Sequence, residues 1–132
     1  MENVTLIGMP GVGKSTLGVV LAKVLGYQFL DSDLVIQKEE KRRLSQIIEQ
    51  EGVEGFMKIE NRVNASIDVS DTVIATGGSV VYCEESMNQL KSIGKVVYLK
   101  YNSTTRWFWE YKITTGLLPA SVLIAEISTG EL

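Results

Sequence analysis

Residues 8–15 read GMPGVGKS, and the expected architecture follows from them. They match the pattern G-x-x-x-x-G-K-[ST] at every fixed position, between an apolar run that predicts a buried strand and a segment with helical periodicity. Glycines permit the close backbone approach through which successive N–H groups surround phosphate oxygens. A helix that begins at such a loop adds the positive end of its dipole. The stretch therefore predicts a P-loop that holds a nucleoside triphosphate with Mg²⁺.

Individual residues of this loop have separate expected roles. Lys14 should bridge the β- and γ-phosphates, the Ser15 hydroxyl should ligate Mg²⁺, and Thr16 is placed to contact the α-phosphate. A chance glycine-rich turn is the alternative, but the strand–loop–helix context argues against it. The expected nucleotide-binding residues are Gly11, Val12, Gly13, Lys14, Ser15 and Thr16.

Strand-like and helix-like segments alternate from this loop to about residue 100. Apolar runs at 4–7, 27–30, 72–76 and 95–99 predict strands, and helices are expected at 14–25, 34–51, 53–67 and 84–93. This alternation predicts an α/β fold, a single domain over residues 1–132 with a central, mostly parallel sheet flanked by helices. The run at 122–127 fits a further strand. The apolar face expected for the first helix contains Leu17, Val20, Leu21, Val24 and Leu25.

Composition excludes several classes of function. The net charge is -3 and no basic block stands out, so neither nucleic acid nor a membrane is an expected partner. Lys41, Arg42 and Arg43 follow two glutamates and are interpreted as a solvated helix face. The chain has no histidine, which excludes Ser-His-Asp and Cys-His nucleophile systems. Its single cysteine, Cys83, cannot form an internal disulfide, which suits a reducing cytoplasm.

Two acidic residues follow the second predicted strand. Ligands of open α/β sheets bind at the carboxyl ends of the strands, so Asp31 and Asp33 are expected near the P-loop. One carboxylate could support the magnesium shell, and the other could accept a proton from an attacking hydroxyl. Helix capping is the alternative, and Asp33 is expected to be able to do both. Gly77 and Gly78 end the third strand at the same edge, where bare backbone would let a substrate lie close; a plain turn is the alternative.

Taken together, the segments GMPGVGKST, FLDSD, GFMKIE and ATGGSVVY resemble shikimate kinase, in this order and at its spacing, over about residues 1–100. The resemblance implies a three-layer P-loop kinase fold with a five-stranded parallel sheet. It also implies a cytoplasmic monomer that uses ATP and Mg²⁺. The implied reaction transfers the γ-phosphate of ATP to the 3-hydroxyl of a small-molecule substrate, shikimate.

The resemblance also implies roles for individual residues. Lys14 and Asp33 would be the catalytic residues, with Asp33 holding the substrate hydroxyls and acting as the candidate base. Ser15 would ligate the metal, and Asp31 would support it through its waters. Glu60 matches the acidic residue of the family's F-R-x-x-E helix motif. The residues expected at the substrate are Asp33, Lys58, Gly77 and Gly78.

Three departures from the family pattern bear on catalysis. Met57 replaces the arginine of F-R-x-x-E, which clamps the substrate carboxylate with a paired hydrogen-bond fork. Lys58 is an imperfect substitute, since adjacent helix positions point about 100° apart. Ser79 replaces the third glycine of the family's motif. The arginine-proline lid and the later carboxylate-binding arginine are not recognisable, because Arg106 is the only arginine after Arg62.

The composition changes near residue 100, and residues 100–132 are atypical of the family. This change suggests a truncated or out-of-frame C-terminal region and impaired turnover. Two other interpretations stay open. One is a P-loop kinase for a different small hydroxyl substrate without a carboxylate, which Met57 favours. The other is a nucleotide-binding domain without turnover, which the missing lid favours.

Overall fold

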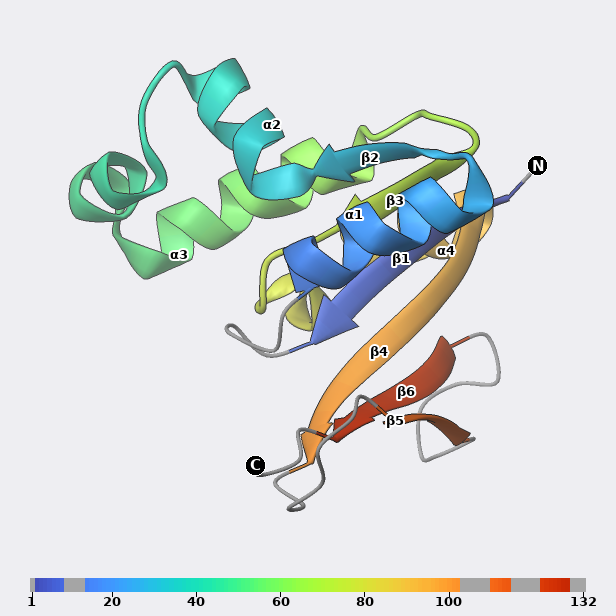
Figure 1. Ribbon diagram of the computed structural model, residues 1–132. Helices are drawn as coiled ribbons and strands as arrows, with labels where there is room; N and C mark the ends of the chain where they lie inside the picture. The colour runs from blue at the N-terminus through green and yellow to red at the C-terminus, as the bar shows by residue number, and fades with distance from the viewer. Residues whose placement is uncertain (1, 9–13, 103–109, 115–121, 129–132) are drawn as a thin grey trace.

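The computed structural model describes residues 2–8, 14–102, 110–114 and 122–128, which form a six-stranded sheet in the order β2-β3-β1-β4-β6-β5 (Figure 1). All neighbouring strands are parallel except β5, which pairs antiparallel with β6. The prediction of a mostly parallel α/β sheet is confirmed, and the run at 122–127 is indeed a strand, paired with β4. The strands are β1 (Asn3–Gly8), β2 (Gln28–Asp31), β3 (Thr72–Ala75), β4 (Gly94–Asn102), β5 (Glu110–Thr114) and β6 (Val122–Ser128).

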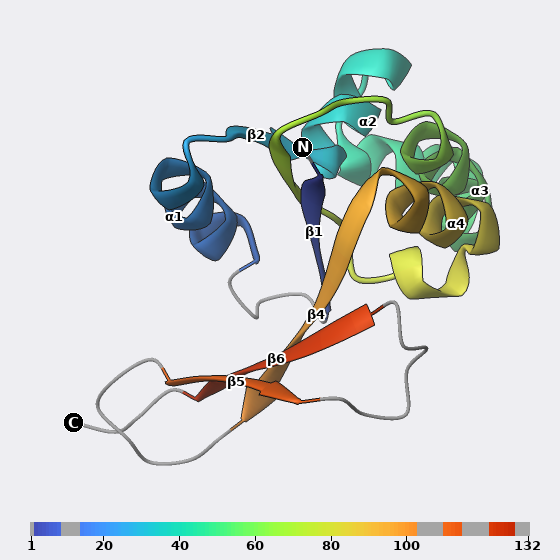
Figure 2. The same cartoon turned by 90° about the vertical axis from the view of Figure 1, so that its right-hand side faces the viewer.

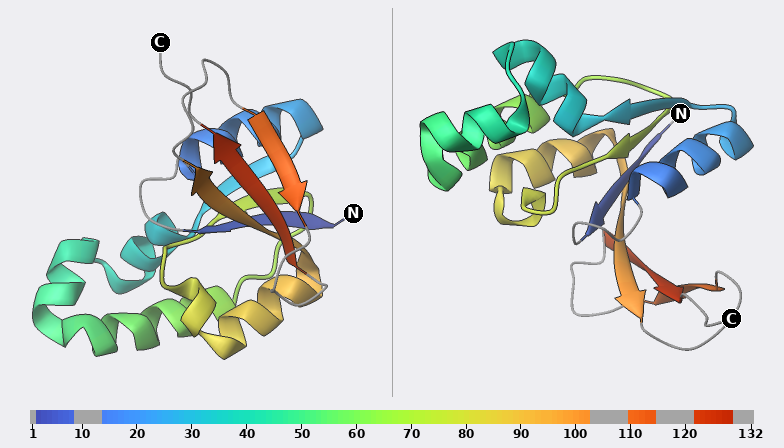
Figure 3. Two further views of the ribbon diagram at one scale, coloured as in Figure 1. Left: turned by 90° about the horizontal axis from the view of Figure 1, so that it is seen from below. Right: turned by 60° about the vertical axis from the view of Figure 1, so that its left-hand side comes forward.

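Helices cover both faces of one half of this sheet. Helix α1 packs on one face, α3 and α4 lie on the other, and α2 packs against α3 (Figure 2). Over β6 and β5 the described part of the chain places no helix, as the further views in Figure 3 also show. None of the described helices is long and apolar enough to cross a membrane. The helices are α1 (Lys14–Leu25), α2 (Ser32–Glu40), α3 (Leu44–Ala65), the 3-10 turn η1 (Val80–Tyr82) and α4 (Glu84–Ile93).

Helix α1 approaches the sheet through small residues. Gly18 and Ala22 are buried, and a Cβ at Gly18 would lie 2.6 Å from the ring of Phe29. Larger side chains beside them, Leu17 and Leu21, pack against the same core. The predicted apolar face is therefore only partly right. The helix turns its small residues toward the sheet, and this orientation leaves three of the larger aliphatic residues exposed. The exposed members of that face are Val20, Val24 and Leu25.

The region predicted as one helix over 34–51 contains a break. Helix α2 ends at Glu40, Lys41 adopts a left-handed conformation with φ 55°, and α3 begins at Leu44. Gly52, expected to separate two helices, does so: it has non-helical angles, φ 74° and ψ 174°, at the kink between the two helical segments of α3. Only glycine adopts such angles readily, so the helix continues past this residue in a new direction.

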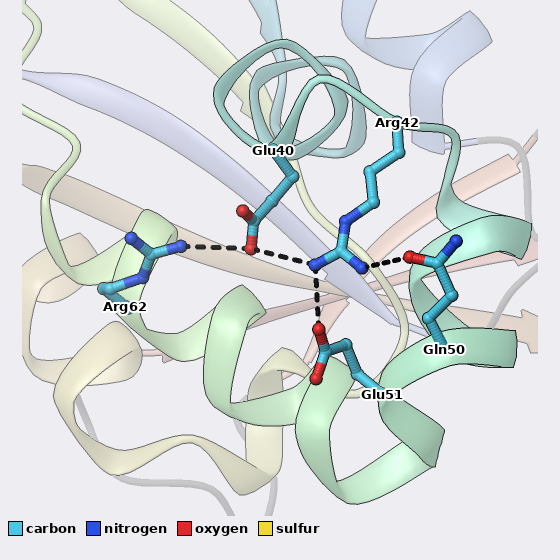
Figure 4. A network of polar contacts seen from close by, with 5 residues as sticks. All are labelled: Glu40, Arg42, Gln50, Glu51 and Arg62. Atoms are coloured by element: carbon cyan, nitrogen blue, oxygen red, sulfur yellow. Dashed lines mark hydrogen bonds and ion pairs between the residues drawn. The ribbon is translucent and has the colours of Figure 1, made fainter.

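Arg42 lies in the connection between α2 and α3, so its interpretation as part of a solvated helix face is wrong. Its guanidinium donates to Gln50 at 2.7 Å and to Glu51 at 3.1 Å, and it lies 3.7 Å from Glu40 (Figure 4). Glu40 also pairs with Arg62 at 3.3 Å. The network thus ties the end of α2 to both segments of the kinked α3, because Gln50 and Glu51 precede Gly52 and Arg62 follows it.

Candidate active site

The carboxyl ends of three neighbouring strands meet at one edge of the sheet. Ala75 of β3 is in register with Asp31 of β2 on one side and with Leu6 of β1 on the other. The buried hydroxyl of Thr76 donates to the Leu6 carbonyl at 2.9 Å, which fastens the chain where it leaves β3. This register brings the predicted P-loop lysine, the two aspartates and the Gly77–Gly78 segment to the same edge, as parallel strands should.

Lys14 begins α1 and is buried, with 8% of its surface exposed. Its Nζ donates to the carbonyl of Gly8 at 2.6 Å. Burial lowers the pKa of Lys14, and the nearby charge of Asp33 opposes this change. Gly8 itself has φ 142°, and a Cβ there would collide with the Leu99 carbonyl, so a side chain is excluded. The predicted nucleotide-binding residues Gly11, Val12 and Gly13 lie outside the described residues.

Asp31 caps helix α2 and also lies near Ser15; the sequence had left both helix capping and a place at the metal site open. Its Oδ1 accepts from the backbone N–H of Asp33 at 2.9 Å, which caps α2. Its Oδ2 lies 3.4 Å from the Ser15 hydroxyl, which donates to it. The cap is thus Asp31 and not Asp33, whose carboxylate remains available to the site. Thr16 follows on the exposed surface of α1.

Ser15 and Asp31 together present oxygen ligands of the kind that Mg²⁺ prefers. The described residues contain no group of three or more His, Cys, Asp or Glu side chains that could hold a metal ion. Mg²⁺ in kinase sites is usually bound by one or two protein groups together with substrate phosphates and water. The Ser15–Asp31 pair therefore fits a magnesium ion that arrives with a nucleotide, rather than a permanently bound one.

A pocket of about 450 Å³ opens beside Asp33, a size typical of small-molecule sites. Burial and the charge of Asp31 raise the pKa of Asp33, and Lys14 partly opposes them. The predicted Gly77 and Gly78 line this pocket, whereas Lys58 is exposed and is not among its lining residues. The lining residues are Asp33, Leu44, Ile48, Phe56, Glu60, Gly77, Gly78, Ser79 and Tyr82.

The residue pattern alone favours a solvated Glu60, since a charge on a helix usually faces water, and the structure shows this interpretation to be wrong. Only 1% of its surface is exposed, and its Oε1 accepts from the Ser79 hydroxyl at 2.5 Å. Burial raises the pKa of Glu60, the Ser79 hydrogen bond opposes this, and the charge of Asp33 adds to it. Phe56 lies four residues earlier on the same helix face, a spacing that could have indicated that Glu60 points inward.

The apolar wall of the pocket also went unrecognised as part of a site. Leu44 and Ile48 come from the first segment of α3, before the kink at Gly52, and Phe56 comes from the second. Their apolar character predicted a buried helix face, but nothing local distinguished a core from a pocket wall. The lining of the site therefore combines two carboxylates, Asp33 and Glu60, with an aliphatic and aromatic surface.

Comparison with known proteins agrees with this geometry. The family model described as "Shikimate kinase" matches residues 10–106. A shikimate kinase of Alkaliphilus oremlandii is 43% identical over 101 residues, which cover 76% of this chain and 60% of that protein. Shikimate kinase 2 of Serratia proteamaculans is 37% identical over 99 residues, covering 75% and 57%. The chain thus spans less than two thirds of the length of these relatives.

Solved structures give the same result. The shikimate kinase of Acinetobacter baumannii in complex with shikimate has a TM-score of 0.67 and 38% identity, over 74% of this chain and 55% of that one. The shikimate kinase of Aquifex aeolicus has a TM-score of 0.68 and 36% identity, over 74% and 59%. The expected three-layer P-loop kinase fold is therefore confirmed.

Proposed function

Because the chain belongs to the shikimate kinase family, we propose that it binds ATP with Mg²⁺ and transfers the γ-phosphate to the 3-hydroxyl of shikimate. The single observation that carries this proposal is the position of Asp33. Its carboxylate lines the acceptor pocket, and the charge of Lys14, at the nucleotide side, acts on it. One carboxylate therefore stands between the place expected for the phosphates and the place available to an alcohol.

On the nucleotide side, we assign the phosphates to the loop that precedes α1. Lys14 would leave the Gly8 carbonyl, its described partner, and neutralise charge on the β- and γ-phosphates. Ser15 and Asp31 would hold Mg²⁺, which supplies charge neutralisation at the phosphates when bound. Thr16 would contact the α-phosphate. Burial lowers the pKa of Lys14 in the free protein, and the negative charge of an arriving phosphate would favour its charged form.

On the acceptor side, Asp33 would accept the proton of the attacking hydroxyl. The oxygen of that hydroxyl would form a bond to the γ-phosphorus while the bond between the γ-phosphorus and ADP breaks. A raised pKa makes a carboxylate a better proton acceptor once it is ionised, and the pKa of Asp33 is raised. Gly77 and Gly78 would let the acceptor ring approach the backbone, and the apolar wall would exclude water. We further propose a cytoplasmic monomer.

Two other functions keep specific support. The lining of the pocket contains two carboxylates and neither lysine nor arginine among the described residues, which favours a hydroxyl acceptor without a carboxylate. The other alternative is a nucleotide-binding domain without turnover, which the unrecognisable arginine-proline lid favours. Lys58, exposed and outside the lining, remains a proposed substrate contact only through its place in the resemblance.

The test is ADP release from ATP and Mg²⁺ with a panel of alcohols that includes shikimate. Shikimate-dependent turnover should fall by about 10²-fold or more in Lys14→Ala and in Asp33→Asn. Lys23→Ala, an exposed lysine of the same helix, and Asp68→Asn, an exposed aspartate, are matched controls that should keep the wild-type rate. Turnover of another alcohol but not shikimate would favour the relative, and ATP binding without turnover on any alcohol would favour the binding domain.

A further inference from the structure

Segment 77–79 is held to helix α3 by one short hydrogen bond. The Ser79 hydroxyl donates to Oε1 of Glu60 at 2.5 Å, and Glu60 is almost fully buried. The other hydrogen bonds described for this segment are local. The Val80 N–H donates to the Gly77 carbonyl at 3.4 Å, and the Tyr82 N–H donates to the Ser79 carbonyl at 3.1 Å. These local bonds shape a turn but do not attach it to α3.

The second oxygen of Glu60 faces the space beside Gly77, at the other end of the same segment. A Cβ built on Gly77 would lie 2.6 Å from Oε2 of Glu60 and 3.3 Å from Oδ1 of Asp33. A side chain at Gly77 would therefore point at the two carboxylates of the acceptor pocket. Since one oxygen of Glu60 accepts from Ser79 and the other occupies the space that such a side chain would need, the position of Glu60 and that of the segment depend on each other.

We propose that Ser79 and Glu60 are positioning residues that hold segment 77–79 against Asp33 and so set where the acceptor alcohol lies. The inference rests on the proposed function, because it takes the Asp33 pocket as the acceptor site. Ser79 stands where the family pattern has a glycine, so this hydroxyl is a feature of this chain. A hydroxyl that donates to an ionised carboxylate makes a stronger bond than one between neutral groups, which suits a segment whose other described hydrogen bonds are local.

The pair acts on acceptor binding and not on the nucleotide. Gly77, Gly78 and Ser79 line the acceptor pocket, whereas Lys14 and Ser15 begin α1 and are not among its lining residues. Loosening segment 77–79 should therefore weaken the acceptor while leaving ATP unaffected. A hydrogen bond that served only stability would change neither constant selectively.

The experiment compares Ser79→Ala with Ser79→Thr, which keeps the hydroxyl, and with Ser66→Ala, which removes a hydroxyl that donates to the Val63 carbonyl away from the pocket. In Ser79→Ala the KM for shikimate should rise about 10-fold, the equivalent of one hydrogen bond, with the KM for ATP unchanged. Ser79→Thr and Ser66→Ala should stay within about 2-fold of wild type. Equal effects on both KM values, or none in Ser79→Ala, would overturn the proposal.

A second measurement separates this inference from the proposed function. If the wild-type protein shows no shikimate-dependent turnover, the proposed reaction fails, and the Kd for shikimate with ADP and Mg²⁺ present replaces the KM. The same 10-fold weakening in Ser79→Ala then supports the positioning role, and an unchanged Kd refutes it. Absence of shikimate binding by the wild type overturns both. Glu60→Gln, whose neutral oxygen makes a weaker bond with the Ser79 hydroxyl, serves if Ser79→Ala does not fold: weaker shikimate binding with ATP binding unchanged supports the proposal, and no change in either overturns it.

Discussion

Gly77→Ala tests the enclosed position of Gly77 directly, through the stability of the protein. The added methyl group would lie 2.6 Å from Oε2 of Glu60 and 3.3 Å from Oδ1 of Asp33, and the first distance is shorter than real Cβ contacts. Either the segment moves or Glu60 moves. An isolated terminal carboxylate would turn aside at little cost, but the Ser79 hydroxyl holds this one and only 1% of the surface of Glu60 is exposed.

The magnitude follows from the cheaper of these two responses. Overpacking a well-filled site costs about 1–3 kcal/mol, and losing a hydrogen bond to a charged group costs about 1.5–3 kcal/mol. We therefore expect Gly77→Ala to lower the free energy of unfolding by about 1–3 kcal/mol. Urea denaturation of the full chain, with the slope compared between variants, measures this loss.

A double-mutant cycle identifies the cause. In a Ser79→Ala background Glu60 is released, so the methyl group of Gly77→Ala should displace it more easily and cost less. The two losses should then sum to more than the double variant shows, with a coupling of about 1 kcal/mol. In a Ser66→Ala background the losses should simply add. Additivity with Ser79→Ala, or no loss in Gly77→Ala alone, would refute the described contact between Gly77 and Glu60.

Three further predictions concern the same region. Met57→Arg should lower the KM for shikimate about 10-fold while leaving that for its uncharged methyl ester unchanged, because a guanidinium can pair with the carboxylate; equal changes for both acceptors would contradict this reasoning. Arg42→Ala should lower the unfolding free energy by about 1 kcal/mol, since its network is partly exposed, and Arg43→Ala, its exposed neighbour, should have little effect. Glu60→Gln should raise Tm at neutral pH and lose that advantage on acidification. The sign follows because the pKa of Glu60 is raised in the folded protein, so the ionised carboxylate lowers the stability of the wild type at neutral pH and protonation removes this cost. A difference in Tm between the two proteins that stays constant across pH would argue against this reasoning.

The sheet could be predicted because its signals are local. Helix α4 was expected at 84–93 and is found there, since two glutamates begin it and Gly94 ends it. Strands of the parallel sheet read as apolar runs with a glycine at or near one end, and their carboxyl ends placed Asp31 and Asp33 near Lys14. The grouping of site residues at the strand ends could therefore be predicted from the order of the segments in the sequence.

The errors arose where nonlocal packing overrides the local pattern. Nothing near Arg42 indicates that its guanidinium bridges Glu40 and Glu51, so the region resembled one continuous helix. On α1 the aliphatic residues suggested a wide buried face, but Gly18 allows a closer approach that leaves Val24 76% exposed. Packing against Phe29 decided this orientation, and it comes from a different element.

The contact between Glu60 and Ser79 could not have been predicted either, because it joins positions 19 residues apart in the sequence. Its formation depends on where the kink at Gly52 directs the second segment of α3. The resemblance marked Glu60 as a motif residue, yet it gave no partner for this carboxylate in a chain with Met57. Ser79 was treated as a mild change, and the structure makes it the donor.

Met57 and Ser79, two departures from the family pattern, are therefore connected through the carboxylate of Glu60. Met57 and Glu60 are three residues apart on α3, so they are neighbours on the helix surface, and Met57 brings no cation to this side. A buried carboxylate needs hydrogen-bond donors when no cation accompanies it, and the Ser79 hydroxyl is such a donor. Both changes lie in the acceptor half of the site, whereas Lys14, Ser15 and Asp31 keep the residue types that the nucleotide half requires. Acceptor recognition, and not nucleotide binding, is thus where this chain should differ first from its relatives.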